Sequence, residues 1–194
     1  MAEPRHSALV RATHWVHTFA FFALIVSGGA ILVAHPRFYW GETGGVGGPS
    51  LFDLPLPFIF GPSGWGRSLH FFAAWIAVLN GLLYAASGWR ARRFPALSRE
   101  YEPAQRRVYL IVIFLLFPVT VLTGLAMSPA LTAVVPVLVE VFGGQQSART
   151  IHFFAASALV LFLLLHVAMV CVSGFTSRMR GMITGQGGAA RNQA

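Results

Sequence analysis

The chain has 194 residues, of which 56% are hydrophobic and 10% charged, and its formal net charge is +8. A soluble domain carries about 25% charged residues, so this composition excludes an ordinary soluble enzyme. All basic residues are arginines that cluster at the ends of apolar runs, whereas a nucleic-acid-binding domain presents a continuous basic face. The charge therefore indicates a membrane protein and not a nucleic-acid partner.

Four apolar runs are each long enough to cross a bilayer, which requires about 20 helical residues. The runs are apolar on all sides, as helices that face lipid are. The sequence therefore predicts an all-α protein, an integral membrane four-helix bundle that forms a single transmembrane domain over residues 1–194. The predicted spans cover about residues 12–34, 68–88, 108–127 and 150–174, and the predicted outer loops cover residues 35–67 and 128–149.

The arginines are distributed unequally between the two sides of this predicted bundle. If the N-terminus is cytoplasmic, Arg37, Arg67 and Arg149 lie outside. The other eleven then lie inside, and these are Arg5, Arg11, Arg90, Arg92, Arg93, Arg99, Arg106, Arg107, Arg178, Arg180 and Arg191. Because cytoplasmic loops carry an excess of basic residues, this asymmetry predicts that both the N- and C-termini are cytoplasmic.

The first span carries two histidines near its start, His14 and His17. An ionisable residue inside a membrane is energetically costly and indicates a functional site. The two side chains lie about 60° apart around a helix and about 4.5 Å apart along it, so either one can serve as a ligand. Gly28 follows His14 by fourteen residues and shares its face. The loop over residues 35–67 is rich in glycine and proline, which exclude a long helix there.

The second and fourth spans open with similar sequences. The matching segments are Arg67-Ser-Leu-His70-Phe-Phe-Ala-Ala and Arg149-Thr-Ile-His152-Phe-Phe-Ala-Ala. His70 and His152 each follow an arginine at the outer end of a span, so they are expected at the same depth. Gly81 lies eleven residues after His70, on nearly the same face and near the inner depth.

The third span contains no histidine and no charged residue, and we interpret it as scaffold. Pro118 lies within it and should bend the helix or leave a carbonyl without its partner. In the second outer loop, the apolar stretch 133–142 is a candidate for a short interfacial helix.

The fourth span contains His152 and His166, which are fourteen residues apart. This spacing is close to four full turns, so both side chains face the same side, about 21 Å apart along the axis. Each then needs a partner at its own depth on a neighbouring helix. His70 is the predicted partner of His152 at the outer depth. His14 is the predicted partner of His166 at the inner depth, and His17 is the alternative to His14.

Two facing imidazoles without thiolates or carboxylates nearby indicate haem iron, because the porphyrin supplies the other four nitrogen ligands. Zinc sites normally use more protein ligands than two. Arg11, Arg67 and Arg149 each precede a histidine by three residues, share its helix face and can pair with haem propionates. Ordinary anchoring of helix ends is the alternative for these arginines. Gly28 and Gly81 would leave room for the flat ring, although glycine is also common where transmembrane helices pack.

These residues resemble the bacterial cytochrome b561 family and the related di-haem cytochrome b subunits of hydrogenases, formate dehydrogenases and thiosulfate reductases. The resemblance covers about residues 8–182 and rests on Arg11-x-x-His14-Trp15, Ser27-Gly28, His70-Phe71-Phe72, Tyr101-x-x-x-Gln105, Leu122-Thr123-Gly124-Leu125, His152 and His166. It implies a four-helix bundle with two haem b groups in the bacterial cytoplasmic (inner) membrane. In the family the histidine of the His-Trp pair is a ligand, which transfers to His14.

The expected function is that of a di-haem b-type cytochrome that carries electrons between the quinone pool and an outer-side oxidoreductase subunit. Tyr84, Tyr109 and Glu140 are candidates for a quinone pocket, and the sequence does not rank them. One alternative is a stand-alone quinone-reducing oxidoreductase, such as a superoxide oxidase. Another is a haem-free membrane anchor or transporter in which the histidines relay protons.

Overall fold

Four helices in the computed structural model are long and apolar enough to cross a membrane. The structure describes residues 7–42, 48–56, 64–90 and 103–185. The spans are α1 (Ala8–Ala34), α2 (Gly64–Arg90), a continuous third helix (Gln105–Ala126) and α7 (Gln145–Val172). The predicted all-α membrane four-helix bundle is therefore confirmed. Each helix begins a few residues before its predicted start, because the polar residues at its outer or inner edge continue the helix.

The third span is not a uniform α-helix. It consists of α3 (Pro103–Ile111), the π-helical turn η2 (Val112–Leu116) and α4 (Phe117–Ala126). Pro118 has no amide hydrogen, and its ring crowds the carbonyl group four residues earlier. The wider π-turn lies directly before this proline, where it accommodates the disturbed hydrogen bonding. The distortion expected at Pro118 therefore takes the form of a local π-helix.

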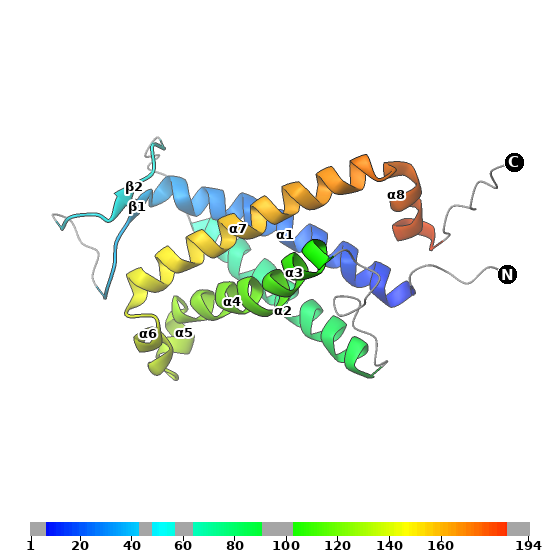
Figure 1. The fold of residues 1–194 in the computed structure, drawn as a ribbon. Coiled ribbons are helices and arrows are strands. Elements are labelled where there is room, and N and C mark those ends of the chain that lie inside the picture. The colour runs from blue at the N-terminus through cyan, green and yellow to red at the C-terminus, as the bar shows by residue number, and fades with distance from the viewer. Residues whose placement is uncertain (1–6, 43–47, 57–63, 91–102, 186–194) are drawn as a thin grey trace, which may run out of the picture.

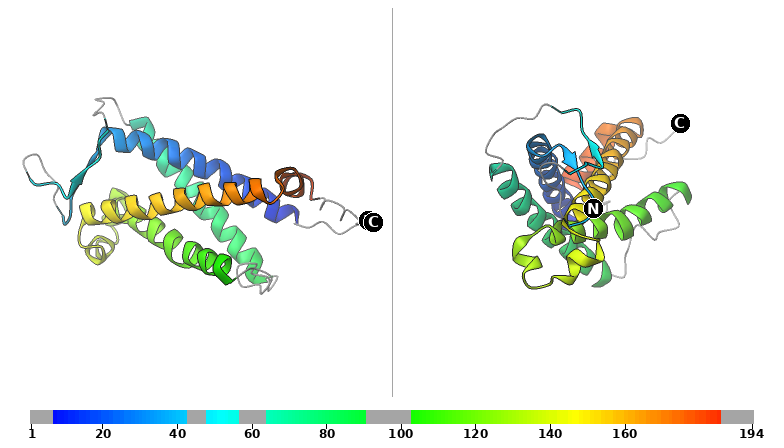
Figure 2. Two further views of the ribbon diagram at one scale, coloured as in Figure 1. Left: turned by 45° about the horizontal axis from the view of Figure 1, so that its top comes forward. Right: turned by 90° about the vertical axis from the view of Figure 1, so that its left-hand side faces the viewer.

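The spans pack as two pairs, α1 with α2 and α4 with α7 (Figures 1 and 2). The backbones approach closely within each pair and only sparsely between the pairs. Many large apolar side chains of the spans are exposed; Phe19 is 70% exposed, Phe72 66% and Phe114 65%. Leaving such surface in water is unfavourable in proportion to its area, so these faces are suited to lipid.

The loop after α1 forms a two-stranded antiparallel hairpin, β1 (Arg37–Phe38) with β2 (Phe52–Asp53). Phe38 is almost fully buried. Its ring stacks on Phe52 with centroids 4.8 Å apart, and it contacts Phe153 of α7 at 4.6 Å. The hairpin is therefore packed onto the start of the fourth span.

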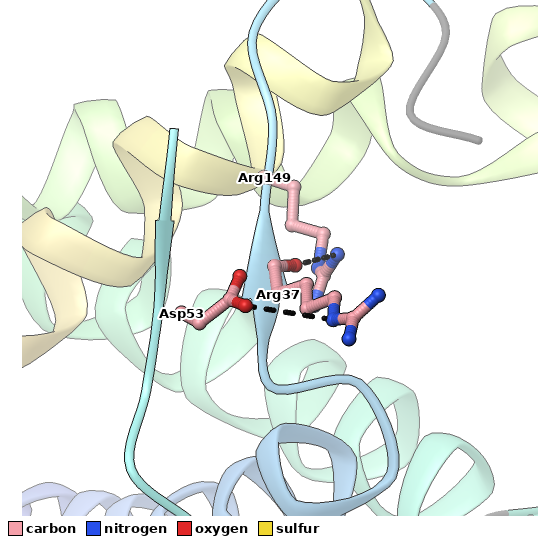
Figure 3. Close-up of polar contacts among 3 residues, drawn as sticks. All are labelled: Arg37, Asp53 and Arg149. Carbon is pink, nitrogen blue, oxygen red and sulfur yellow. Dashed lines mark hydrogen bonds and ion pairs between the residues drawn. The ribbon is translucent and has the colours of Figure 1, made fainter. Parts of the chain in front are cut away.

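Arg149 fastens this hairpin to α7. Its guanidinium donates hydrogen bonds to the carbonyl of Arg37 (3.1 Å, Figure 3) and to the carbonyl of His35. It also lies over the Phe38 ring, 4.8 Å from the centroid. Arg37 in turn pairs with Asp53 across the two strands at 3.6 Å (Figure 3). This ion pair is exposed, so it contributes little stability. The contacts of Arg149 therefore contribute more to the packing of the hairpin on α7.

The two ends of the bundle carry different elements (Figure 1). The hairpin lies at one end with the short helices α5 (Pro129–Thr132) and α6 (Val137–Val141), and we call this the hairpin end. The stretch expected to be a short interfacial helix thus contains α6 and adjoins α5. The hairpin end corresponds to the predicted outer side.

At the opposite end, α8 (Phe175–Thr184) runs across the end of the bundle and contacts the start of α1 (Figure 1). We call this the α8 end. The indole of Trp15 donates to the Met182 carbonyl at 3.2 Å, and Arg11 Nη1 donates to the Ile183 carbonyl at 3.5 Å. The first and last described helices therefore meet at one end. Which side of the membrane this end faces stays a prediction. Five of the arginines that are predicted to be cytoplasmic lie outside the described residues, namely Arg5, Arg92, Arg93, Arg99 and Arg191.

Candidate functional site

The rings of His70 and His152 meet between the two helix pairs. His70 projects from α2 and His152 from α7, and their ring centroids are 6.2 Å apart with the planes inclined at 66°. The two residues are far apart in the sequence, so the fold alone brings them together. This is the facing arrangement that the matched segments at the start of the second and fourth spans predict.

His152 is held by α4 through its Nδ1 atom. That atom lies 3.0 Å from the Thr123 hydroxyl oxygen and 3.0 Å from the Thr120 carbonyl oxygen. A carbonyl oxygen only accepts hydrogen bonds, so Nδ1 must carry the hydrogen. In the neutral imidazole Nε2 then has the free lone pair, and it is available as a ligand atom.

His70 is held by α1 in a corresponding way. Its Nδ1 atom lies 3.0 Å from the hydroxyl oxygen of Ser27. Ser27 is fully buried, and its hydroxyl donates to the Ala23 carbonyl at 2.6 Å. Because the hydroxyl hydrogen is used there, the oxygen accepts from His70, and Nε2 of His70 is again the unprotonated nitrogen.

A glycine follows each of these hydroxyl residues and lies beside the imidazole. A Cβ added at Gly28 would stand 3.6 Å from Cε1 of His70, and one added at Gly124 would stand 3.4 Å from Cε1 of His152. Gly28 therefore lies at the depth of His70. A Cβ added at Gly81 would meet no atom within 4 Å, so there is open space beside this residue.

The remaining intramembrane histidines lie nearer the α8 end and have aromatic neighbours. His14 contacts Trp15 edge-on with centroids 5.7 Å apart. His166 stacks on Phe162 at 6.1 Å. His17 contacts Phe117 of α4 at 5.4 Å. The structure places His14 and His166 on different helix pairs, and their pairing stays a prediction.

The three predicted arginines differ in their surroundings. Arg149 uses its guanidinium on the carbonyls of the hairpin, and Arg67 is exposed near the start of α2. Arg11 bonds α8 through Nη1, whereas its Nε is buried and has no partner among the described residues. The Nε atom of Arg106, on α3, is likewise buried and has no partner among the described residues. Buried donors normally have a partner, so Arg11 and Arg106 fit an anionic group.

Several of these residues had no assigned role at the level of sequence. Ser27, Thr123 and Gly124 belong to short motifs of small residues, which are usually signs of helix packing in membranes. Arg106 precedes an apolar run and is indistinguishable by sequence from a helix-end anchor. The sequence signal for the first three is their place in two motifs of the resemblance, Ser27-Gly28 and Thr123-Gly124, in each of which a hydroxyl residue precedes a glycine.

The donor set of the facing pair fits haem iron. Among the residues that the structure describes, no group of three His, Cys, Asp or Glu side chains comes together as a metal site. Imidazole nitrogens bind metals at about 2 Å, so two rings that ligate one ion from opposite sides have centroids about 6 Å apart. The 6.2 Å between His70 and His152 agrees with that value. A porphyrin supplies the four ligands that the protein does not.

Two comparisons place the chain among known proteins. A family model described as prokaryotic cytochrome b561 matches residues 5–185. The putative protein-methionine-sulfoxide reductase subunit YedZ1 of Azospira oryzae is 32% identical over 195 residues, which cover 86% of this chain and 90% of that protein. No solved structure matches the chain. The matched range includes all four spans and all the intramembrane histidines.

Proposed function

Because this chain belongs to the prokaryotic cytochrome b561 family, we propose that it binds two haem b groups and carries electrons between the quinone pool and an outer-side oxidoreductase subunit. The family and the four spans make it a multi-pass bacterial membrane protein that binds haem and transfers electrons. The number of haems, the quinone and the position of the partner are the proposal.

The observation that carries the proposal is the facing pair at the hairpin end. His70 and His152 would be the axial ligands of one haem, each through Nε2. Hydrogen bonds from their Nδ1 atoms to α1 and α4 hold the rings in place and fix the tautomer. A bound haem supplies a one-electron carrier, and the surrounding side chains keep it apart from water.

The second haem would lie nearer the α8 end, with His14 and His166 as axial ligands. The buried, unpartnered Nε atoms of Arg11 and Arg106 support this position, because they would be satisfied by propionate oxygens. The open space at Gly81 also supports it. The contact of His17 with Phe117 favours His14 as the ligand.

For the quinone, we favour the α8 end as well. The Tyr109 ring contacts Phe162, which stacks on His166, with centroid distances of 6.0 Å and 6.1 Å. Gln105 donates to the Tyr109 hydroxyl at 3.1 Å. Amide and hydroxyl groups are the donors that quinone carbonyls require. Glu140, in contrast, lies on α6 at the hairpin end.

The partner is proposed from the relative. That protein is named as a putative subunit of a reductase, which supports a reductase partner for this chain. The hairpin end would contact it, since the positive-inside rule places this end outside.

The haem assignment is tested by measuring haem per purified full-length chain for His70→Ala and His152→Ala, with His35→Ala as a matched loop control. The wild type and His35→Ala are expected to hold two haems per chain. His70→Ala and His152→Ala are each expected to hold one. Two haems in both span variants would refute the ligand pair. A colourless wild type would instead favour the haem-free anchor or transporter.

The same purified protein is used to test whether the chain reacts with quinone and whether it turns over substrate without a partner. Reduced quinone is expected to reduce the haems of the purified chain, and failure to do so would refute the quinone link. Turnover of superoxide and quinone by the purified chain alone would favour the stand-alone oxidase.

The orientation is tested by cysteine labelling in the Cys171→Ala background. Ser50→Cys, at the hairpin end, is expected to react with an impermeant maleimide from outside. Ser177→Cys, on α8, is expected to react only after the membrane is opened. The reverse pattern would overturn the predicted orientation and with it the outer-side partner.

A further inference from the structure

Two hydroxyl side chains hold the facing histidines in the same way. Ser27 of α1 lies 3.0 Å from Nδ1 of His70, and Thr123 of α4 lies 3.0 Å from Nδ1 of His152. Both residues are fully buried. We propose that Ser27 and Thr123 are matched positioning residues that set the reduction potential of the haem held between the two histidines. This inference rests on the proposed ligand pair.

The direction of the hydrogen bonds follows from the neighbouring carbonyl groups. The Ser27 hydroxyl donates to the Ala23 carbonyl, and the Thr123 hydroxyl donates to the Val119 carbonyl, each at 2.6 Å. A hydroxyl group has one hydrogen, so both oxygens are left as acceptors. Each imidazole Nδ1–H therefore donates to a hydroxyl oxygen, and His152 shares this hydrogen with the Thr120 carbonyl.

The same unit occurs twice in the bundle. In each helix pair, one helix carries a hydroxyl residue followed by a glycine, Ser27-Gly28 or Thr123-Gly124. The other helix carries the segment Arg-x-x-His-Phe-Phe-Ala-Ala. In both pairs the glycine lies against Cε1 of the histidine while the hydroxyl contacts Nδ1. The two ligands thus have equivalent supports, although they come from different parts of the chain.

An acceptor on Nδ1–H makes the imidazole a stronger electron donor through Nε2. A stronger donor favours the oxidised iron and lowers the reduction potential. Removal of either hydroxyl is therefore expected to raise the potential of the haem at the hairpin end. Because the supports match, Ser27→Ala and Thr123→Val should act in the same direction and by similar amounts, and the double variant should shift the potential further.

The experiment is an optical redox titration of the purified full-length protein with both haems bound. Ser87→Ala is the matched control, since the Ser87 hydroxyl donates to the Tyr84 carbonyl of its own helix, α2, at 2.7 Å. That substitution removes the same kind of helix hydrogen bond about 25 Å along α2 from His70. Thr123→Ser keeps the hydroxyl and tests rescue.

The expected result is a higher potential for one haem in Ser27→Ala and Thr123→Val, with the other haem unchanged. Ser87→Ala and Thr123→Ser should retain both wild-type potentials. Unchanged potentials in Ser27→Ala and Thr123→Val would overturn the inference, as would an equal shift in Thr123→Ser. Thr123→Val could lose the haem altogether. In that case retention of the haem in Thr123→Ser would support the inference, and loss of the haem in Thr123→Ser would overturn the inference.

Failure of this inference is distinguishable from failure of the ligand pair. If His70→Ala removes one haem while the hydroxyl variants leave the potentials unchanged, only the positioning role fails. If His70→Ala keeps both haems, the proposed function fails at this site.

Discussion

Gly144 faces the carbonyl group of Gly41, and a side chain at position 144 would overlap it. The Gly41 oxygen accepts hydrogen bonds from the amides of Gln146 (3.0 Å) and Ser147 (3.4 Å). The Gly41 amide donates to the Ser147 hydroxyl at 2.7 Å. The first amides of a helix have no partner within the helix, so the loop after α1 supplies the cap of α7. This contact fixes the hairpin over the start of the fourth span.

Gly144→Ala is therefore expected to release the hairpin, and Gly143→Ala is its matched control. Gly144 has φ 112° and ψ 164°, a conformation open essentially to glycine alone, and Gly143 has φ 72°, so alanine costs roughly 1–3 kcal/mol of backbone strain at either position. Only position 144 also meets the Gly41 backbone. Hydrogen exchange of a peptide that contains Leu51 and Leu54 is the measurement, because both amides are bonded within the loop. If hydrogen exchange is accelerated equally in the two variants, backbone strain and not overlap with Gly41 releases the hairpin.

Arg149→Lys is expected to loosen the same hairpin without loss of haem. The planar guanidinium of Arg149 serves two carbonyls and lies over Phe38, and an ammonium group cannot reproduce this geometry. We expect faster hydrogen exchange in residues 48–56 and two haems per chain. If Arg149→Lys and Arg149→Ala both lose one haem, Arg149 holds a propionate as the sequence suggests.

Docking of the hairpin should also depend on pH through His35, which lies just beyond α1. The pKa of His35 is lowered from 6.5, first by burial and then by the charges of Arg149 and Arg67. The folded form therefore binds fewer protons than the unfolded form, and stability rises with pH in this range. The stabilisation is complete above about pH 6.5 and is lost as the pH falls below it. The hydrogen-exchange rate of residues 48–56 in the wild type, divided by the rate in His35→Asn, should rise as the pH falls from 7.5 to 5.5. A ratio that stays constant over this range would contradict the prediction.

The sequence predicts the spans and the depths of the histidines because both depend on regular helices. Composition marks the spans, and a fixed rise and rotation per residue place His70 and His152 at one level. The roles of Ser27 and Thr123 depend instead on how the helices cross, which periodicity does not specify. The position of Arg149 depends on a loop that folds back, and strands of two residues are too short to show an alternating pattern. Local geometry thus follows from sequence here, whereas contacts between elements do not.

The glycines beside the histidines should tolerate little added volume. Gly28→Leu would press on the His70 ring, whereas Gly29→Leu meets open space at its Cβ. We expect Gly28→Leu to lose the haem at the hairpin end and Gly29→Leu to retain both haems. Gly124→Ala should have a partial effect, since its Cβ would stand 3.4 Å from the His152 ring. The measurement is haem per chain, and equal loss in the two leucine variants would point to a general folding defect.

The contacts of the His14 and His17 rings distinguish the two candidate ligands on α1. The His17 ring meets Phe117 of α4, so its volume is already used in packing within the bundle. The His14 ring adjoins Trp15, whose indole is fixed by a hydrogen bond to α8. His17→Phe is expected to keep two haems, because phenylalanine preserves an aromatic contact with Phe117.

His14→Phe and His166→Phe are each expected to reduce the count from two haems to one and to leave the spectrum of the haem at the hairpin end unchanged. The readout is haem per chain together with the reduced-minus-oxidised spectrum. Loss of one haem in His17→Phe with two retained in His14→Phe would assign the ligand to His17.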